Sequence, residues 1–151
     1  MSPPAAVLVL MGVDGCGRTT LAAALQRALA PHPANGTADG AAVQLLCSPA
    51  LQRAQRAALR ARLPGLHFIY LEIDVRSAAR RLQGRPAREA SARSIAGQFA
   101  QLEPPDGEAD VLRLCALQPV AALLRQILDW PPVAALAPRI DGQAAAAGDG
   151  R

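Results

Sequence analysis

The chain has 151 residues, of which 51% are hydrophobic, so it is the size of one domain and can bury a substantial core. Aromatic residues make up only 3%, and the core must therefore consist mainly of Leu, Ala, Val and Ile. The formal net charge of +4 is modest, and no basic tract is interleaved with aromatic residues, so no nucleic-acid partner is expected.

The three cysteines, Cys16, Cys47 and Cys115, lie far apart and lack the spacing of a metal site. An odd number of cysteines without a signal-peptide pattern favours reduced thiols in the cytosol. The first apolar run, residues 6–11, is too short to cross a bilayer. We therefore expect a cytoplasmic protein that does not bind a membrane.

That apolar run predicts a buried strand at residues 6–11, and a helix is predicted at residues 18–30. A glycine-rich loop, residues 12–20, joins them in the strand–loop–helix context of a phosphate-binding P-loop, G-x-x-x-x-G-K-[ST]. Its glycines allow backbone N–H groups to point at phosphate oxygens, and the helix N-terminus adds partial positive charge. The predicted nucleotide-binding residues are Gly12, Val13, Asp14, Gly15, Cys16, Gly17, Arg18, Thr19 and Thr20.

Two positions of this loop define its chemistry. Thr19 is predicted to place its hydroxyl on Mg²⁺. Arg18 stands where the pattern has a lysine that reaches the β- and γ-phosphates, and arginine keeps the charge on a bulkier, planar group. The alternative is a glycine turn between a strand and a helix that binds no ligand.

The rest of the chain alternates strands with helices. Strands are predicted at 43–47, 67–73 and 111–115. Helices are predicted from Pro49 to about Leu63, and at 75–83, 92–102 and 119–129. This order indicates an α/β fold of the P-loop NTPase type: three α/β/α layers with a mostly parallel sheet of four predicted strands. Residues 1–130 form the predicted P-loop domain, and 131–151 are expected to be a flexible tail rich in Pro, Ala and Gly.

Further segments carry more specific patterns. Residues 47–60 contain Cys-Ser, Ala-Leu-Gln-Arg and later arginines, and residues 68–71 read Phe-Ile-Tyr-Leu. Residues 81–85 read Arg-Leu-Gln-Gly-Arg, and residues 98–103 read Q-F-x-x-L-E. In this order, and together with the glycine-rich loop, they resemble the gluconokinases, small P-loop kinases that phosphorylate D-gluconate with ATP. The resemblance covers roughly residues 5–130.

The chain departs from this family after the first predicted helix. The family continues there into a second strand that ends in an aspartate, followed by a substrate segment, whereas this chain has only the short loop 31–41. The family's aspartate would orient or deprotonate the acceptor hydroxyl, and Asp39 is the local carboxylate that could substitute for it. In the glycine-rich loop, the family has M-G-V-S-G-x-G-K-S-T where this chain has M-G-V-D-G-C-G-R-T-T.

The resemblance implies ATP and Mg²⁺ as cofactors and a sugar acid, D-gluconate, as the small-molecule substrate. In the catalytic role, Arg18 would neutralise charge on the β- and γ-phosphates, while Arg81 and Arg85 would close over the transferring phosphoryl group. In the family, the segment that matches residues 81–85 leads into a lid, and Gln98 would help to fix the lid helix or contact the nucleotide.

The remaining candidates concern the sugar acid. His32 and Asn35 survive from the family's substrate segment. Arg53 and Arg56 could bind the gluconate carboxylate, because guanidinium groups recognise planar anions in a bidentate manner. Solvated helix arginines are the plainer interpretation of both.

Two alternatives to a gluconokinase-like enzyme remain open. One is a catalytically impaired pseudokinase that binds a nucleotide, which the missing substrate segment favours. The other is a nucleoside monophosphate kinase, because the glycine-rich loop also resembles that of thymidylate kinases. The sequence leaves the oligomeric state open between a monomer and a homodimer.

Overall fold

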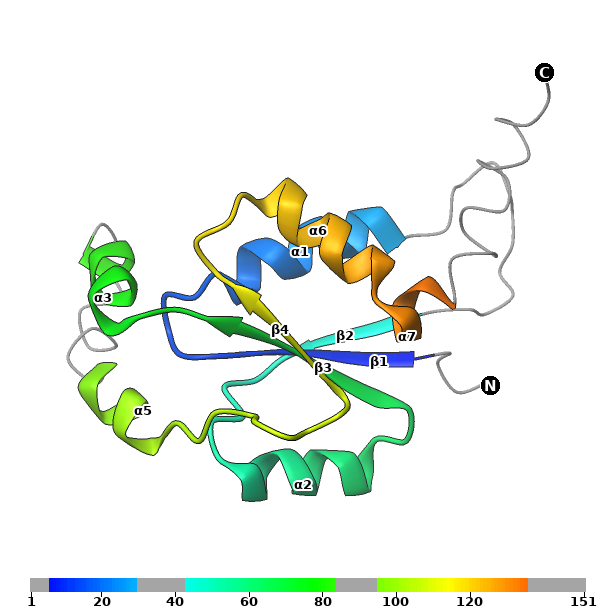
Figure 1. Cartoon of the computed structure of the whole chain (residues 1–151), viewed down its shortest axis with the longest axis horizontal. Coiled ribbons are helices and arrows are strands. Elements are labelled where there is room, and N and C mark those ends of the chain that lie inside the picture. Colours follow the sequence, from blue (N-terminus) through cyan, green and yellow to red (C-terminus); the bar gives the residue numbers. More distant parts are fainter. Residues whose placement is uncertain (1–5, 30–42, 84–94, 136–151) are drawn as a thin grey trace.

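The computed structural model describes residues 6–29, 43–83 and 95–135. They form a single sheet with helices packed around it (Figure 1). The strands are β1 (Ala6–Met11), β2 (Val43–Cys47), β3 (Leu66–Glu72) and β4 (Val111–Cys115). The helices are α1 (Arg18–Leu29), α2 (Arg53–Arg62), α3 (Val75–Gln83), α5 (Ile95–Gln101), α6 (Val120–Asp129) and α7 (Pro131–Ala134).

The four strands are ordered β2-β1-β3-β4, and all three pairings are parallel. One row of opposed residues crosses the whole sheet: Val9 lies between Leu46 and Phe68, and Phe68 is in turn opposite Val111. The expected strands and the parallel sheet are confirmed. Because all strands run in one direction, their carboxyl ends meet at one edge, where ligands bind in open α/β sheets.

Strand β1 is buried on both faces, which explains its continuous apolar sequence. Leu8 and Leu10 belong to the core cluster that includes α1 and α6 residues. Val7, Val9 and Met11 point to the opposite face, into the cluster that α2 covers. Successive side chains of a strand alternate between faces, so this single strand contributes to both halves of the core.

The helices form the two outer layers. Figure 1 shows α1, α6 and α7 over one face of the sheet and α2 over the other, while α3 and α5 lie towards the end to which the strands point. Helix α1 packs against α6, and α3 packs against α5. The structure thus has the expected three-layer α/β/α architecture.

Two boundaries differ from the sequence prediction. Helix α2 begins at Arg53 rather than near Pro49, because Ala50 has a φ of 44°, which is outside the right-handed helical region. Gly12 N–H donates to the Pro49 carbonyl at 3.2 Å, so this irregular stretch is fastened to the glycine-rich loop.

The expected tail is ordered at its start, where residues 131–134 form α7. Val133 is only 2% exposed and belongs to the main core cluster. The start of the expected flexible tail at 131 is therefore wrong, since the fold continues to at least Ala135. The residues from 136 onward lie outside the described part of the chain.

Candidate nucleotide site

The glycine-rich loop turns sharply between β1 and α1. Gly12, Gly15 and Gly17 have φ values of 147°, 89° and 99°, a region that side chains with a Cβ rarely adopt. A Cβ on Gly15 would lie 2.8 Å from the carbonyl oxygen of Ala78 in α3, so glycine is also required there by space. The loop ends where Leu21 N–H donates to the Gly17 carbonyl at 3.0 Å and α1 begins.

Beside this loop lies a cavity of about 370 Å³, which we call the loop cavity. It lies at the carboxyl ends of β1 and β4, as expected for a parallel sheet. Its wall combines the loop, the start of α1, the end of α3 and the connection from β4 into α6. The lining residues are Asp14, Gly15, Cys16, Gly17, Arg18, Thr19, Thr20, Leu21, Arg81, Leu82, Ala116, Gln118, Val120 and Leu123.

Arg18 supplies a cation to this cavity. Its Nη2 lies 3.4 Å from Oδ1 of Asp14, four residues earlier, and its side chain is 16% exposed. Its Nη1 is buried and has no hydrogen-bond partner among the described residues. A buried donor without a partner is costly, so the site fits an anionic acceptor such as a phosphate oxygen.

The start of α1 adds to this anion site. Thr19 and Thr20 are exposed and line the cavity, in the first turn of the helix. The first turn of a helix has backbone N–H groups without intrahelical partners and a partial positive charge. The residues of the cavity therefore fit a nucleoside polyphosphate. The Mg²⁺ ligand role of Thr19 stays a prediction from the loop pattern.

Gln98 of α5 contacts the glycine-rich loop directly. Its Oε1 accepts the backbone N–H of Asp14 at 2.8 Å, and its Nε2 donates to Oδ2 of Asp14 at 2.9 Å. The side chain thus pairs with both the backbone and the carboxylate of one loop residue. Gln98 holds the loop against α5 across 84 positions of sequence.

Arg81 bridges two walls of the cavity. Its Nη1 donates to the carbonyl oxygens of Gly15 and Cys16 at 3.3 and 3.2 Å, and its Nη2 donates to the Ala116 carbonyl at 2.9 Å. The guanidinium therefore ties the glycine-rich loop to the connection after β4. In this arrangement the Arg81 donors position the walls of the cavity that Arg81 lines. A role of Arg81 over the transferring phosphoryl group stays a prediction.

Cys16 lies within the loop but is 2% exposed. Burial raises the pKa of its thiol to about 11, although the cations of Arg18 and Arg81 act in the opposite direction. A thiol with a raised pKa is protonated at neutral pH and is a poor nucleophile. Cys16 therefore fills space beneath the loop, where its Sγ would lie 2.8 Å from a Cβ on Gly12.

Arg56 does not line the cavity. Its side chain is fully buried, and it donates to the carbonyls of Ala50 at 2.7 Å and Glu103 at 2.8 Å. Its Nε and Nη2 donate to the Glu108 carboxylate at 2.9 and 2.8 Å. All three guanidinium nitrogens are engaged, so the geometry gives Arg56 a structural role between α2 and the residues before β4.

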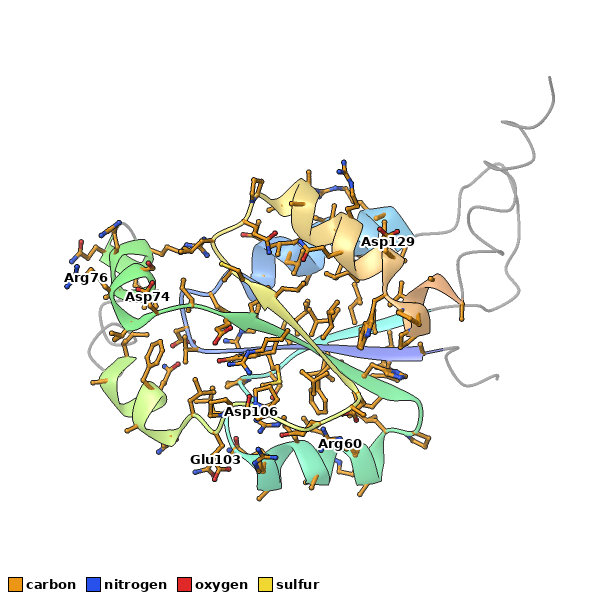
Figure 2. The ribbon with its side chains drawn as sticks, in the orientation of Figure 1. Arg60, Asp74, Arg76, Glu103, Asp106 and Asp129 are labelled. Atoms are coloured by element: carbon orange, nitrogen blue, oxygen red, sulfur yellow. The ribbon has the colours of Figure 1, made fainter. Side chains whose placement is uncertain are left out.

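Arg53 belongs to the same network, at the N-terminus of α2. It donates to the Glu108 carboxylate at 3.2 Å and to the Asp106 carbonyl at 3.0 Å. Figure 2 shows Glu103, Asp106 and Arg60 gathered around α2, on the other side of the sheet from Asp129 of α6. We call residues 103–110 the acidic segment; with Arg53, Arg56 and Arg60 of α2 they form an ion-pair network outside the loop cavity.

The structure thus brings together the whole glycine-rich loop, Arg81 and Gln98. His32, Asn35, Asp39 and Arg85 lie outside the described residues. Sequence reasoning missed the cavity wall that follows β4. The sequence does contain a signal for this wall. Ala116 and Gln118 follow the carboxyl end of the strand expected at 111–115, and parallel sheets bind ligands at the carboxyl ends of their strands.

In the part of the chain that the structure describes, no helix combines the length and apolarity needed to traverse a lipid bilayer. Comparison with family models and with curated proteins gives no match.

Several solved structures are similar to this chain in fold. A gluconokinase from Sinorhizobium meliloti 1021 is similar with a TM-score of 0.69 at 23% identity, over 94% of this chain and 99% of that one. A sugar kinase from Janibacter sp. HTCC2649 is similar with a TM-score of 0.68 at 21% identity, over 88% and 98% of the two chains. A deoxyadenosine kinase from M. mycoides with bound dATP gives 0.54 at 11% identity, over 81% and 97%. With its parallel sheet and glycine-rich loop, this chain has the P-loop fold of these kinases.

Proposed function

We propose that this chain is a cytoplasmic ATP-dependent phosphotransferase with D-gluconate as the acceptor and 6-phospho-D-gluconate as the product. The observation that carries the proposal is the loop cavity, where the Nη1 of Arg18, which has no hydrogen-bond partner within residues 6–29, 43–83 and 95–135, lies at the N-terminus of α1. The ordered resemblance of roughly residues 5–130 to gluconokinases supports a sugar acid as acceptor. The likeness to a solved gluconokinase and a solved sugar kinase is consistent with it.

In this proposal the loop amides and Arg18 bind the β- and γ-phosphates. Among the described residues, no group of three His, Cys, Asp or Glu side chains could hold a metal ion. In this proposal the Thr19 hydroxyl and phosphate oxygens would hold Mg²⁺, as the P-loop Ser/Thr and the phosphates do in P-loop NTPases, where an aspartate assists. When bound, it would neutralise charge on the β- and γ-oxygens.

The acceptor side of the proposal rests on residues outside the described ranges. His32 and Asn35 would contact the sugar acid, Arg85 would approach the transferring group, and Asp39 would orient the acceptor hydroxyl or take its proton. The acceptor oxygen forms a bond to the γ-phosphorus as the bond to the bridging oxygen breaks. A general base of this kind contributes about 10²–10⁴-fold to the rate.

The test is gluconate-dependent ADP formation by the purified protein with ATP and Mg²⁺, with the product identified as 6-phosphogluconate by mass spectrometry. Reactions without gluconate measure background ATP hydrolysis. We expect ADP and 6-phosphogluconate in equal amounts. ATP binding without any transfer to gluconate at saturating ATP contradicts the proposal.

A second candidate is a pseudokinase that binds the nucleotide without turnover. Two observations favour it: Arg18 is paired with Asp14, and the donors of Arg56 are all used within the protein. Calorimetry would then detect ATP binding while the coupled assay stays at background. Activity with a nucleoside monophosphate, and none with gluconate, would instead identify the third alternative, a nucleoside monophosphate kinase.

A further inference from the structure

The carboxylate of Asp14 is held from two sides. Gln98 of α5 binds Oδ2 at 2.9 Å and also accepts the Asp14 backbone N–H at 2.8 Å. Arg18 of α1 reaches Oδ1 only at 3.4 Å. The short, two-point contact therefore anchors the carboxylate to α5, and the longer contact to Arg18 is the one that a competing anion would break.

The two partners of this ion pair are also the two unusual residues of the loop. Asp14 stands where the resembled pattern has serine, and Arg18 stands where it has lysine. Asp14 lies in the loop before α1, and the turn of the loop brings its carboxylate to within 3.4 Å of the Arg18 guanidinium. Both side chains are partly buried, at 16% and 22% exposure, so solvent screens their interaction less than it would on an open surface.

We propose that Asp14 is an affinity-setting residue of the loop cavity: an internal counter-ion, anchored by Gln98, that occupies Arg18 until a phosphate group displaces it. The proposal rests on the proposed function, because it takes the displacing ligand to be the polyphosphate of a nucleotide. Arg18 contacts the carboxylate through Nη2, and its buried Nη1 meets no acceptor in the described part of the chain. Because Gln98 keeps the carboxylate in place, its negative charge remains beside the bound phosphates and weakens their binding.

Removal of that charge should therefore tighten anion binding. Asp14→Asn is nearly isosteric and keeps the backbone contact to Gln98. We expect it to lower the Kd for ATP about tenfold, as a charge pair of this burial allows. The matched control is Asp129→Asn, which changes the net charge equally at the exposed far end of α6 (Figure 2). It should change the Kd less than about twofold, because screening weakens charge effects over that distance.

The experiment is isothermal titration calorimetry with ATP, and separately with inorganic pyrophosphate, on the full chain. The variants are Asp14→Asn, Arg18→Met, the double variant and Asp129→Asn. In the Arg18→Met background, Asp14→Asn has no cation to release. The increase in ATP affinity that Asp14→Asn causes should therefore fall to about threefold or less. The same cycle on the urea unfolding of the ligand-free protein should show a favourable coupling between Asp14 and Arg18.

The outcomes separate this inference from the proposed function. Equal ATP affinity in the wild type and Asp14→Asn overturns the inference and leaves nucleotide binding intact. Tighter pyrophosphate binding by Asp14→Asn, with no ATP binding by any variant, supports the inference and removes the proposed function. If Asp14→Asn binds neither anion more tightly, or if the gain is the same without Arg18, Asp14 is not a counter-ion to Arg18.

Discussion

The Arg56 guanidinium lies 2.8 Å from the Glu108 carboxylate although the two residues are 52 positions apart and the arginine is fully buried. Arg53 and Arg60 also contact Glu108, so one carboxylate joins three arginines of α2. Because α2 covers one face of the sheet and the acidic segment leads into β4, this network fixes that helix to the far strand.

Replacement of the buried Arg56 should therefore lower the free energy of unfolding. Arg56→Met removes the fully buried one of the three arginine partners of Glu108 and leaves the carbonyl oxygens of Ala50 and Glu103 without this donor. We expect the free energy of unfolding to fall by about 3–5 kcal/mol. Equilibrium urea unfolding measures it. The control is Arg113→Met, which removes an ion pair to Glu72 that is 40% and 48% exposed and should cost about 1 kcal/mol or less. Equal costs at the two positions would contradict the structural role of Arg56.

The same network predicts how stability depends on pH. The donors of Arg56 and Arg60 lower the pKa of Glu108 from an ordinary 4.5 to about 2. As the pH falls, Glu108 is therefore protonated in the unfolded chain before it is protonated in the folded protein. Its contribution to the free energy of unfolding is complete above pH 4.5 and declines as the pH falls towards 2. At pH 3 we expect a loss of about 2 kcal/mol relative to pH 6.

Denaturant unfolding at a series of pH values measures this loss. Glu108→Gln should be less stable at pH 6 and should lose less stability on acidification. Some pH dependence should persist in that variant, because hydrogen bonds also lower the pKa values of Glu72 and Asp74. If the variant has the same pH profile as the wild type, Glu108 is not the group that titrates.

The fold could be predicted from sequence where the signal is local. The glycine-rich loop lies between an apolar run and a helix, so its position and its glycines can be recognised within one stretch of sequence, whereas its contacts to Pro49, Arg81 and Gln98 cannot. The role of Arg56 could not be predicted in this way, because its partner Glu108 is 52 positions away and only the tertiary structure brings them together. Helix α7 was missed for a similar reason: four residues carry little periodicity, and Val133 is buried by neighbours that the sequence does not reveal.

A substitution at Gly15 tests whether ATP binding depends on the conformation of the glycine-rich loop. Gly15→Ala places a methyl group 2.8 Å from the Ala78 carbonyl at a φ of 89°, so the loop must shift. We expect ATP affinity to fall at least about tenfold, since the loop amides would no longer converge on the phosphates. Calorimetry with ATP measures this.

The matched control for that variant is Gly107→Ala. Gly107 has a similar φ of 78°, but a Cβ there would meet nothing within 4 Å. This variant therefore introduces the same kind of backbone strain, about 1 kcal/mol, away from the loop cavity. It should lower stability and leave the Kd for ATP unchanged. A comparable loss of affinity in both variants would mean that destabilisation alone, and not loop geometry, controls binding.

The three thiols should differ in reactivity. Cys47 and Cys115 are exposed, whereas Cys16 is buried and its pKa is raised from 9.0 to about 11. That increase lowers the thiolate fraction near pH 8 about a hundredfold, and burial slows access further. Brief iodoacetamide treatment of the native protein should therefore modify Cys47 and Cys115 and spare Cys16, as peptide mass mapping can show. In guanidinium all three should react, and rapid labelling of native Cys16 would mean that the loop does not pack over its thiol as the structure describes.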